Sequence, residues 1–185
     1  PRAILADDMG LGKTAQAASA LRVSFNQGRV KTSLILCPRS LLANWEVELR
    51  NWAPELSSLV MVPTGQHRHR AWQEVLGRIH VLITNYEQLL TMPEPLKDFK
   101  FNVVIADEAH RIRNLSARAT KGVRQLHSDT FWALTGTPIE RDEKDLLTIL
   151  STLAPYQFSS STKGYVSPET LRARARPFVL RRLKK

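Results

Sequence analysis

The chain has 185 residues, of which 43% are hydrophobic and 24% are charged, a composition typical of one globular domain with a buried core. No apolar run reaches the roughly 18–20 residues that a membrane-spanning helix needs, and the first residues lack the anatomy of a signal peptide. The single cysteine, Cys37, excludes an intrachain disulfide and lies in an apolar run, so we expect a buried small side chain. We therefore expect a soluble intracellular protein with no membrane partner.

The net charge of +10 is concentrated near the C-terminus. Residues 171–185 contain seven arginines and lysines and no acids, which leaves +3 for residues 1–170. Such a segment favours a polyanion by Coulomb attraction and counterion release. A solvated linker, or a segment that packs on another domain, would have the same composition. Charge alone leaves these interpretations open.

Short apolar runs alternate with amphipathic stretches along the chain. The predicted strands are residues 3–6, 33–37, 59–62, 81–84, 103–106 and 130–134. The predicted helices are residues 14–26, 41–52, 70–77, 86–90 and 116–126. Continuous apolar runs are typical of parallel strands that are covered on both faces. The alternation predicts right-handed crossovers and a three-layer α/β domain with a mainly parallel central sheet.

The first predicted strand leads directly into a glycine-containing loop, Asp7-Asp8-Met9-Gly10-Leu11-Gly12-Lys13-Thr14, which opens a helix. Glycines let backbone N–H groups converge on phosphate oxygens, and the helix N-terminus adds its positive dipole end. Lys13 would reach the β- and γ-phosphates of ATP, and the Thr14 hydroxyl would bind Mg²⁺. Asp7 stands where the usual P-loop pattern has its first glycine. Taken alone, the loop also fits a strand–helix turn with a chance lysine.

The fifth predicted strand runs into two carboxylates, Asp107 and Glu108, which are followed by Ala109 and His110. Open α/β sheets bind ligands at this carboxyl edge. Asp107 would hold Mg²⁺ through water, and Glu108 would orient or deprotonate the attacking water. The alternative is that the two acids cap the helix that follows.

The sixth predicted strand ends in Thr135-Gly136-Thr137-Pro138. These hydroxyl side chains could sense the γ-phosphate, although Gly-Thr-Pro also makes an ordinary turn. Beyond them, residues 142–153 predict a helix and residues 155–167 a loop. We expect an ATP-binding lobe over residues 1–155, truncated at its N-terminus, and a loop with a basic segment over residues 156–185.

Together these motifs resemble those of the Swi/Snf-like ATPases of helicase superfamily two, whose nucleotide loop also carries an acid where Asp7 stands. Residues 36–45 resemble the family's next motif, which touches the nucleic-acid backbone, and residues 83–87 resemble the one after that. The acid box continues through residues 107–114, with Arg113 where lysine is commoner. The third motif is similar over residues 134–140, although Glu140-Arg141 replaces a more usual Gln-Asn pair. Residues 178–182 resemble the segment that leads toward a second lobe.

The resemblance covers nearly the whole chain and implies a RecA-like P-loop NTPase lobe that works with a second RecA-like lobe of the same parent chain. It implies ATP and Mg²⁺ as cofactors, double-stranded DNA as partner, and ATP-driven translocation of the chromatin- or protein–DNA-remodelling type. Lys13, Asp107 and Glu108 are the implied catalytic residues, with Thr14 and Asp107 at the metal. The implied nucleotide contacts are Asp7, Asp8, Met9, Gly10, Leu11, Gly12, Lys13 and Thr14. The implied coupling or DNA contacts are Pro38, Arg39, Ser40, Asn85, Tyr86, His110, Thr135, Gly136 and Thr137.

This resemblance places the protein in the nucleus of a eukaryote or in the nucleoid-containing cytoplasm of a bacterium. With the second lobe's arginines absent, we expect very slow hydrolysis by these 185 residues alone. Trp45, at helical spacing with Leu41 and Leu49, is expected to pack in the core rather than on DNA. Two other functions stay open: a non-hydrolysing module that binds DNA or a partner, and the lobe of an RNA helicase. Intact Lys13, Asp107 and Glu108 argue against the first, and the Thr-Gly-Thr-Pro motif argues against the second.

Overall fold

The computed structural model describes residues 2–114, 117–136, 147, 149–152, 158 and 168–184, and in this part of the chain seven parallel strands form one sheet. The strands are β1 Arg2–Leu5, β2 Ser33–Cys37, β3 Ser58–Val60, β4 Val81–Asn85, β5 Lys100–Ala106, β6 His127–Leu134 and β7 Val179–Leu180. Their order across the sheet is β3-β4-β2-β5-β6-β1-β7. Because β5 and β6 lie between β1 and β2, the first crossover passes over two strands that come later in the chain.

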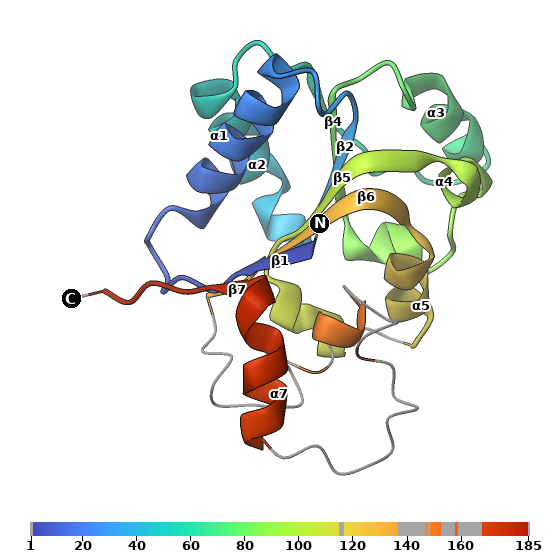
Figure 1. Cartoon of the computed structure of the whole chain (residues 1–185). Helices are drawn as coiled ribbons and strands as arrows, with labels where there is room; N and C mark the ends of the chain where they lie inside the picture. The colour runs from blue at the N-terminus through green and yellow to red at the C-terminus, as the bar shows by residue number, and fades with distance from the viewer. Residues whose placement is uncertain are drawn as a thin grey trace.

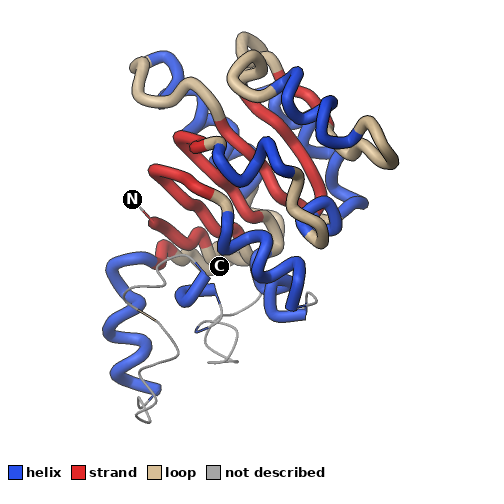
Figure 2. The backbone as a smooth tube through the Cα atoms, turned by 90° about the vertical axis from the view of Figure 1, so that its right-hand side faces the viewer, coloured by secondary structure: helices blue, strands red, loops and turns tan. Residues whose placement is uncertain are grey.

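Helices cover both faces of the twisted sheet, which makes three layers (Figures 1 and 2). One face is covered by α1 Lys13–Asn26 and α2 Leu42–Trp52. The other is covered by α3 Arg68–Val75, α4 Glu94–Asp98, α5 Ala117–Gln125 and α7 Pro168–Ala175. Short 3-10 segments join these elements: η1 Arg39–Leu41, η2 Tyr86–Leu89, η3 Ala109–Asn114 and η4 Arg176–Phe178.

The core consists of two apolar clusters, one on each face, because successive side chains of a strand point to opposite sides. In β2, Leu34 and Leu36 pack on the α3–α5 side, whereas Ile35 and Cys37 pack on the α1–α2 side. All five residues of β2 are buried, as expected for a central strand between two helix layers. Within the described residues, no helix is long and apolar enough to cross a membrane.

The predicted three-layer fold and all six predicted strands are confirmed, with limits that differ by up to three residues. The predicted helix 70–77 lies at Arg68–Val75, since Gly77 adopts a φ of 76° that no helix continues. The predicted helix 86–90 is the 3-10 segment η2, which begins where the Asn85 side chain accepts a hydrogen bond from the Gln88 amide. Of the predicted helix 142–153, residues 147 and 149–152 are helical, and the rest lies outside the described residues.

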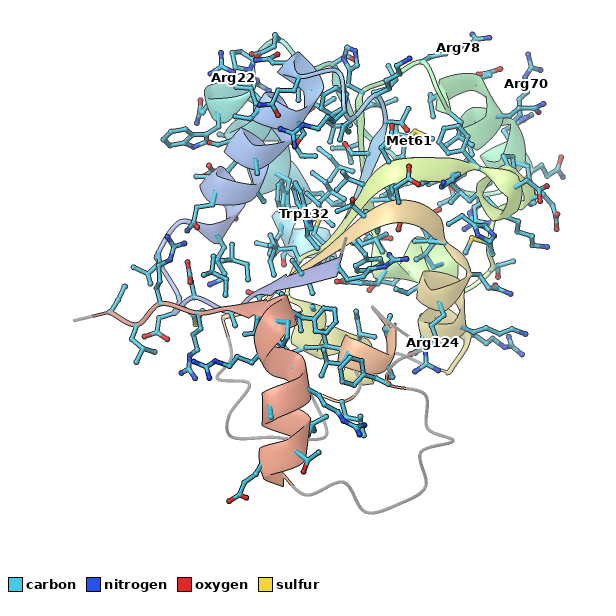
Figure 3. The ribbon with its side chains drawn as sticks, in the orientation of Figure 1. Arg22, Met61, Arg70, Arg78, Arg124 and Trp132 are labelled. Atoms are coloured by element: carbon cyan, nitrogen blue, oxygen red, sulfur yellow. The ribbon has the colours of Figure 1, made fainter. Side chains whose placement is uncertain are left out.

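The described part of the basic C-terminal segment packs on the domain. Leu171 and Ala175 are buried in the core cluster on the α3–α5 side of the sheet, and β7 pairs in parallel with β1. The chain then runs beside the loop that joins β1 to α1 (Figure 1). The predicted boundary at residue 155 lies outside the described residues. Arg22, Arg70, Arg78 and Arg124 project from the periphery, away from this loop (Figure 3).

Candidate functional site

The polar motifs predicted from the sequence meet at one edge of the sheet. Asp7 follows β1, Thr135 follows β6 and Asp107 follows β5, and these three strands are neighbours. The register pairs Leu5 with Leu134 and Ala133 with Ala106, so the three strands end at about the same level. The carboxyl edge of a parallel sheet is where α/β domains bind their ligands.

The loop between β1 and α1 has the curvature of a phosphate-binding loop. Gly10 and Gly12 have φ angles of 82° and 69°, a region that glycine enters without steric cost. Gly12 is the N-cap of α1, so Lys13 and Thr14 lie in its first turn. The Lys13 ammonium donates hydrogen bonds to the backbone oxygens of Asp7 at 2.8 Å and Asp8 at 3.3 Å. The Lys13 ammonium therefore lies against the backbone of the loop that precedes α1.

Lys13 also lies beside Gly136 of the third motif and interacts electrostatically with Asp107 of the acid box. A Cβ atom placed on Gly136 would come within 3.3 Å of Lys13 Nζ and 2.7 Å of Met9 Cγ. Burial raises the pKa of Asp107 above its ordinary value, and the nearby positive charge of Lys13 is among the effects that lower it. Lys13 and Asp107 therefore occupy the same edge of the molecule, as the proposed nucleotide site requires.

Asp107 is buried and is held by four hydrogen bonds. Its backbone N–H donates to Leu36 O at 2.7 Å, and its backbone oxygen accepts from the Tyr86 hydroxyl at 2.6 Å. Its Oδ1 accepts from the Glu108 amide at 2.9 Å, and its Oδ2 accepts from Trp45 Nε1 at 2.8 Å. Burial raises the pKa of Asp107, while the Trp45 and Glu108 donors act in the opposite direction. The carboxylate is thus fixed in orientation before any ligand binds.

Glu108 has a φ of 48°, the left-handed conformation that non-glycine residues rarely adopt. Its Oε2 lies 3.2 Å from Nδ1 of His110, and Thr135 Oγ1 lies 3.4 Å from the same nitrogen. These contacts connect the acid box after β5 with the third motif after β6. Backbone strain of this kind concentrates at functional sites, where the surrounding structure maintains it.

The first position of the loop contains a contact that the sequence did not reveal. Asp7 is fully buried, and its Oδ1 accepts a hydrogen bond from the Arg182 amide at 2.8 Å. Its Oδ2 accepts from Arg182 Nε at 3.0 Å and from Gln16 Nε2 at 3.3 Å. Burial alone would raise the pKa of Asp7, but the bonds from Arg182 and Gln16 outweigh it and hold that pKa below its ordinary value. Arg182 is 175 residues away in the chain, so no local pattern could have indicated the pair.

The predicted coupling and DNA-contact residues divide into exposed and buried groups. Arg39 and Ser40 are exposed at the start of η1, beyond the carboxyl end of β2, whereas Pro38 is buried. Asn85 is buried as the cap of η2, and Tyr86 is buried with its hydroxyl on Asp107. His110 and Gly136 are partly exposed, and Thr135 is buried. Thr137 lies outside the described residues.

Two single residues behave as the sequence predicts. Trp45 of α2 is fully buried in the cluster between the α1–α2 layer and the sheet, as predicted. Its hydrogen bond to Asp107 could not be predicted from helical periodicity. Cys37 is also buried, and burial, with the nearby charges of Asp107 and Glu87, raises its pKa to about 12. A thiol with such a pKa is unreactive at neutral pH.

The residues at this edge fit a magnesium–triphosphate ligand. A loop with two left-handed glycines leads into a helix N-terminus, and the same sheet edge carries the Lys13 ammonium and the pre-oriented Asp107 carboxylate. Oxygen ligands from a carboxylate and a hydroxyl are those that Mg²⁺ prefers. Fold and site thus define the class of α/β domains that carry a P-loop at the edge of a parallel sheet.

Comparison with known proteins narrows this class. A family model described as SNF2-related domain matches residues 2–185. Mouse chromodomain-helicase-DNA-binding protein 6 is 32% identical over 203 residues, covering 98% of this chain and 8% of the relative. Mouse chromodomain-helicase-DNA-binding protein 1-like is 33% identical over 198 residues, covering 98% of this chain and 22% of the relative. The chain belongs to the SNF2-related family.

Solved structures agree with this assignment. The Sulfolobus solfataricus SWI2/SNF2 ATPase core in complex with dsDNA superimposes with a TM-score of 0.83 at 35% identity, covering 99% of this chain and 40% of that one. The Sulfolobus solfataricus SWI2/SNF2 ATPase core domain superimposes with a TM-score of 0.78 at 34% identity, covering 97% of this chain and 38% of that one. The fold is therefore the RecA-like fold of the SWI2/SNF2 ATPase core. The chain spans less than a quarter of the two mouse relatives.

Proposed function

We propose that this chain is the first ATP-binding lobe of a DNA-dependent ATPase that translocates on double-stranded DNA and remodels protein–DNA complexes. The observation that carries the proposal is the shared sheet edge, where the Lys13 ammonium lies at the loop after β1 and Asp107 and Glu108 follow β5. We propose that a second RecA-like lobe follows in the same polypeptide and that the protein acts where cellular DNA is kept.

Each residue would have a distinct task at this site. The backbone N–H groups around Gly10 and Gly12 would hold phosphate oxygens, and Lys13 would exchange its bonds to loop carbonyls for bonds to the β- and γ-phosphates. Thr14 and Asp107 would hold Mg²⁺, Asp107 through water. Bound Mg²⁺ would neutralise charge that develops on the phosphates. Glu108 would orient the attacking water and accept its proton, since its carboxylate is partly exposed beside His110.

The contact from Glu108 to His110 and on to Thr135 would report the state of the γ-phosphate from one strand end to the next. Asp7, Asp8, Met9 and Leu11 complete the loop as its backbone frame. The DNA part of the proposal is supported by the family, by a relative solved with dsDNA, and by the exposure of Arg39 and Ser40 at the same edge. Arg39 would contact a phosphate of the DNA backbone.

The proposal is tested by phosphate release from the full-length protein, with and without duplex DNA. We expect duplex DNA to stimulate release by the wild type, and Glu108→Gln to lower the stimulated rate by about 10²–10⁴-fold while ATP still binds. Glu74→Gln, an exposed acid paired with Arg70 on α3, is the matched control and should hydrolyse as the wild type does.

Two results would overturn the proposal and identify the rival that replaces it. Equal, negligible release by wild type and Glu108→Gln, with or without DNA, would indicate a non-hydrolysing binding module. Stimulation by RNA in preference to duplex DNA would indicate an RNA helicase lobe.

A further inference from the structure

The Trp45 indole connects the start of α2 with the acid box. Trp45 lies in the first turn of α2, five residues after the exposed Ser40, and its Nε1 donates to Asp107 Oδ2 at 2.8 Å. Both partners are buried, so water does not compete for this bond. A hydrogen bond to a charged acceptor in a site of low dielectric is strong and costly to break.

The bond restrains the Asp107 carboxylate from an element other than its own strand and the loop that follows it. The backbone of Asp107 is held by Leu36 and Tyr86, and its Oδ1 is held by the adjacent Glu108 amide. Oδ2 is held by a donor from a different element, α2. The rotation of the carboxylate about its side-chain bonds is therefore set jointly by the Glu108 amide and by where α2 places the indole. A rigid side chain with one donor is suited to this task, since Trp45 packs against buried residues throughout.

We infer that Trp45 is a positioning residue through which DNA contact at the start of α2 changes the orientation of Asp107 and so stimulates hydrolysis. The inference rests on the proposed function and assigns its DNA coupling to one hydrogen bond. A small shift of η1 and α2 on DNA moves the indole, and the carboxylate follows because its donor moves. Other partners that hold a metal-binding carboxylate in this way usually affect metal affinity and rate by about 10–100-fold.

The chain offers a matched control in Trp72. Like Trp45, Trp72 is 0% exposed, but it packs on the opposite face of the sheet, and among the described residues its Nε1 has no hydrogen-bond partner. Trp72→Phe removes the same atoms as Trp45→Phe and leaves a similar space, without touching Asp107. Comparison of the two variants therefore separates loss of packing from loss of the donor.

The contact itself is tested by NMR on the 185-residue chain, without nucleotide or hydrolysis. Trp→Phe variants assign the indole N–H resonances of Trp45 and Trp72. We expect Asp107→Ala to move the Trp45 resonance and speed its exchange with solvent, while the Trp72 resonance stays in place. An unmoved Trp45 resonance in Asp107→Ala would overturn the inference.

The coupling is tested in the full-length protein by the ratio of phosphate-release rates with and without duplex DNA. We expect Trp45→Phe to lower this ratio by about 10-fold or more and to raise the Mg²⁺ concentration for half-maximal rate, with a smaller change in KM for ATP. Trp72→Phe should keep the ratio within about twofold of the wild type, even at an equal loss of thermal stability.

The outcomes distinguish this inference from the proposed function. No DNA stimulation of the wild type would reject both. A stimulated wild type together with an unchanged ratio in Trp45→Phe would reject the inference alone, as would an equal fall of the rates with and without DNA. A fall of the ratio in both tryptophan variants would assign the effect to packing and also reject it.

Discussion

At the scale of single residues, Glu108 has a strained backbone at the position where we propose that it activates water. Its φ of 48° is the one positive value among the described non-glycine residues. A non-glycine residue in this region costs about 1–3 kcal/mol, which the surrounding contacts must offset. The residue we propose for water activation therefore lowers the stability of the fold that carries it.

This strain predicts that Glu108→Gly stabilises the chain while it abolishes hydrolysis. Glycine adopts the same φ without a Cβ clash, so we expect the thermal midpoint to rise by about 2–4 °C, as about 1 kcal/mol gives at this chain length. Glu108→Gln keeps the strain and should leave the midpoint near that of the wild type. Calorimetry or thermal circular dichroism on the 185-residue chain measures both, and a lower midpoint for Glu108→Gly would contradict the prediction.

At the scale of elements, the Asp7–Arg182 pair joins the phosphate loop to the segment that follows β7. The backbone reinforces this junction, because Ala6 N donates to Leu180 O at 2.8 Å and Asp8 N donates to Arg182 O at 3.1 Å. The Lys184 amide then donates to Asp8 Oδ2 at 3.1 Å. Whatever chain follows Lys184 is thus attached to the loop that we propose binds phosphate.

Arg182→Ala should destabilise the chain most strongly at neutral pH. The variant leaves the buried Asp7 charge without its two guanidinium donors, so we expect a thermal midpoint about 2–4 °C lower at pH 7. In the wild type the pKa of Asp7 is below its ordinary value of 3.8, so its contribution is present above that pH and is lost as the pH falls through the lower folded value. The difference between wild type and variant should therefore shrink below about pH 4.

Thermal denaturation between pH 3 and 7 measures this difference. Arg174→Ala removes an exposed arginine of α7 and serves as the control, with a midpoint close to that of the wild type at every pH. In an Asp7→Asn background, Arg182→Ala should add little, because the charge that it neutralised is gone. A difference between wild type and Arg182→Ala that does not depend on pH would exclude Asp7 as its cause.

The sequence predicted elements well where their pattern is local. Apolar runs such as Ser33–Cys37 are buried on both faces and identify central strands without further information. Strand β7 was not predicted, because two residues carry no pattern and its pairing with β1 bridges almost the whole chain. The helices α4 and α7 were also not predicted, since five and eight residues are too few for a clear periodicity.

The same distinction applies to the site. Lys13, Asp107, Glu108 and Thr135 follow from motifs at strand ends, and the structure brings those strand ends together. Arg182 on Asp7 and Trp45 on Asp107 are long-range contacts, separated by 175 and 62 residues. A buried carboxylate needs a partner, but the sequence does not state which one. The roles assigned to the motif residues stay predictions.

At the scale of the whole molecule, two of the positive charges close to the proposed site are already engaged, while a third, the Lys184 ammonium, lies beside Gly10 of the loop. Among the described residues, the Lys13 ammonium binds loop carbonyls and the Arg182 guanidinium binds Asp7 and Gln16. The bonds to Asp7 hold Arg182 at the loop, so it is not free to follow charge that develops on a γ-phosphate. We propose that transfer of that phosphate also needs a cation from a second lobe, as the family resemblance implies.

We therefore expect the 185-residue chain to bind MgATP but to hydrolyse it very slowly. A lost transition-state electrostatic partner costs about 3–4 kcal/mol, or 10²–10³-fold in rate. Binding is measured with a fluorescent ATP analogue, with Lys13→Ala as the variant that should not bind, and turnover is measured by phosphate release with and without duplex DNA. Rapid, DNA-stimulated turnover by this chain alone would show that its own residues complete the site, and that the second lobe supplies something other than the catalytic cation.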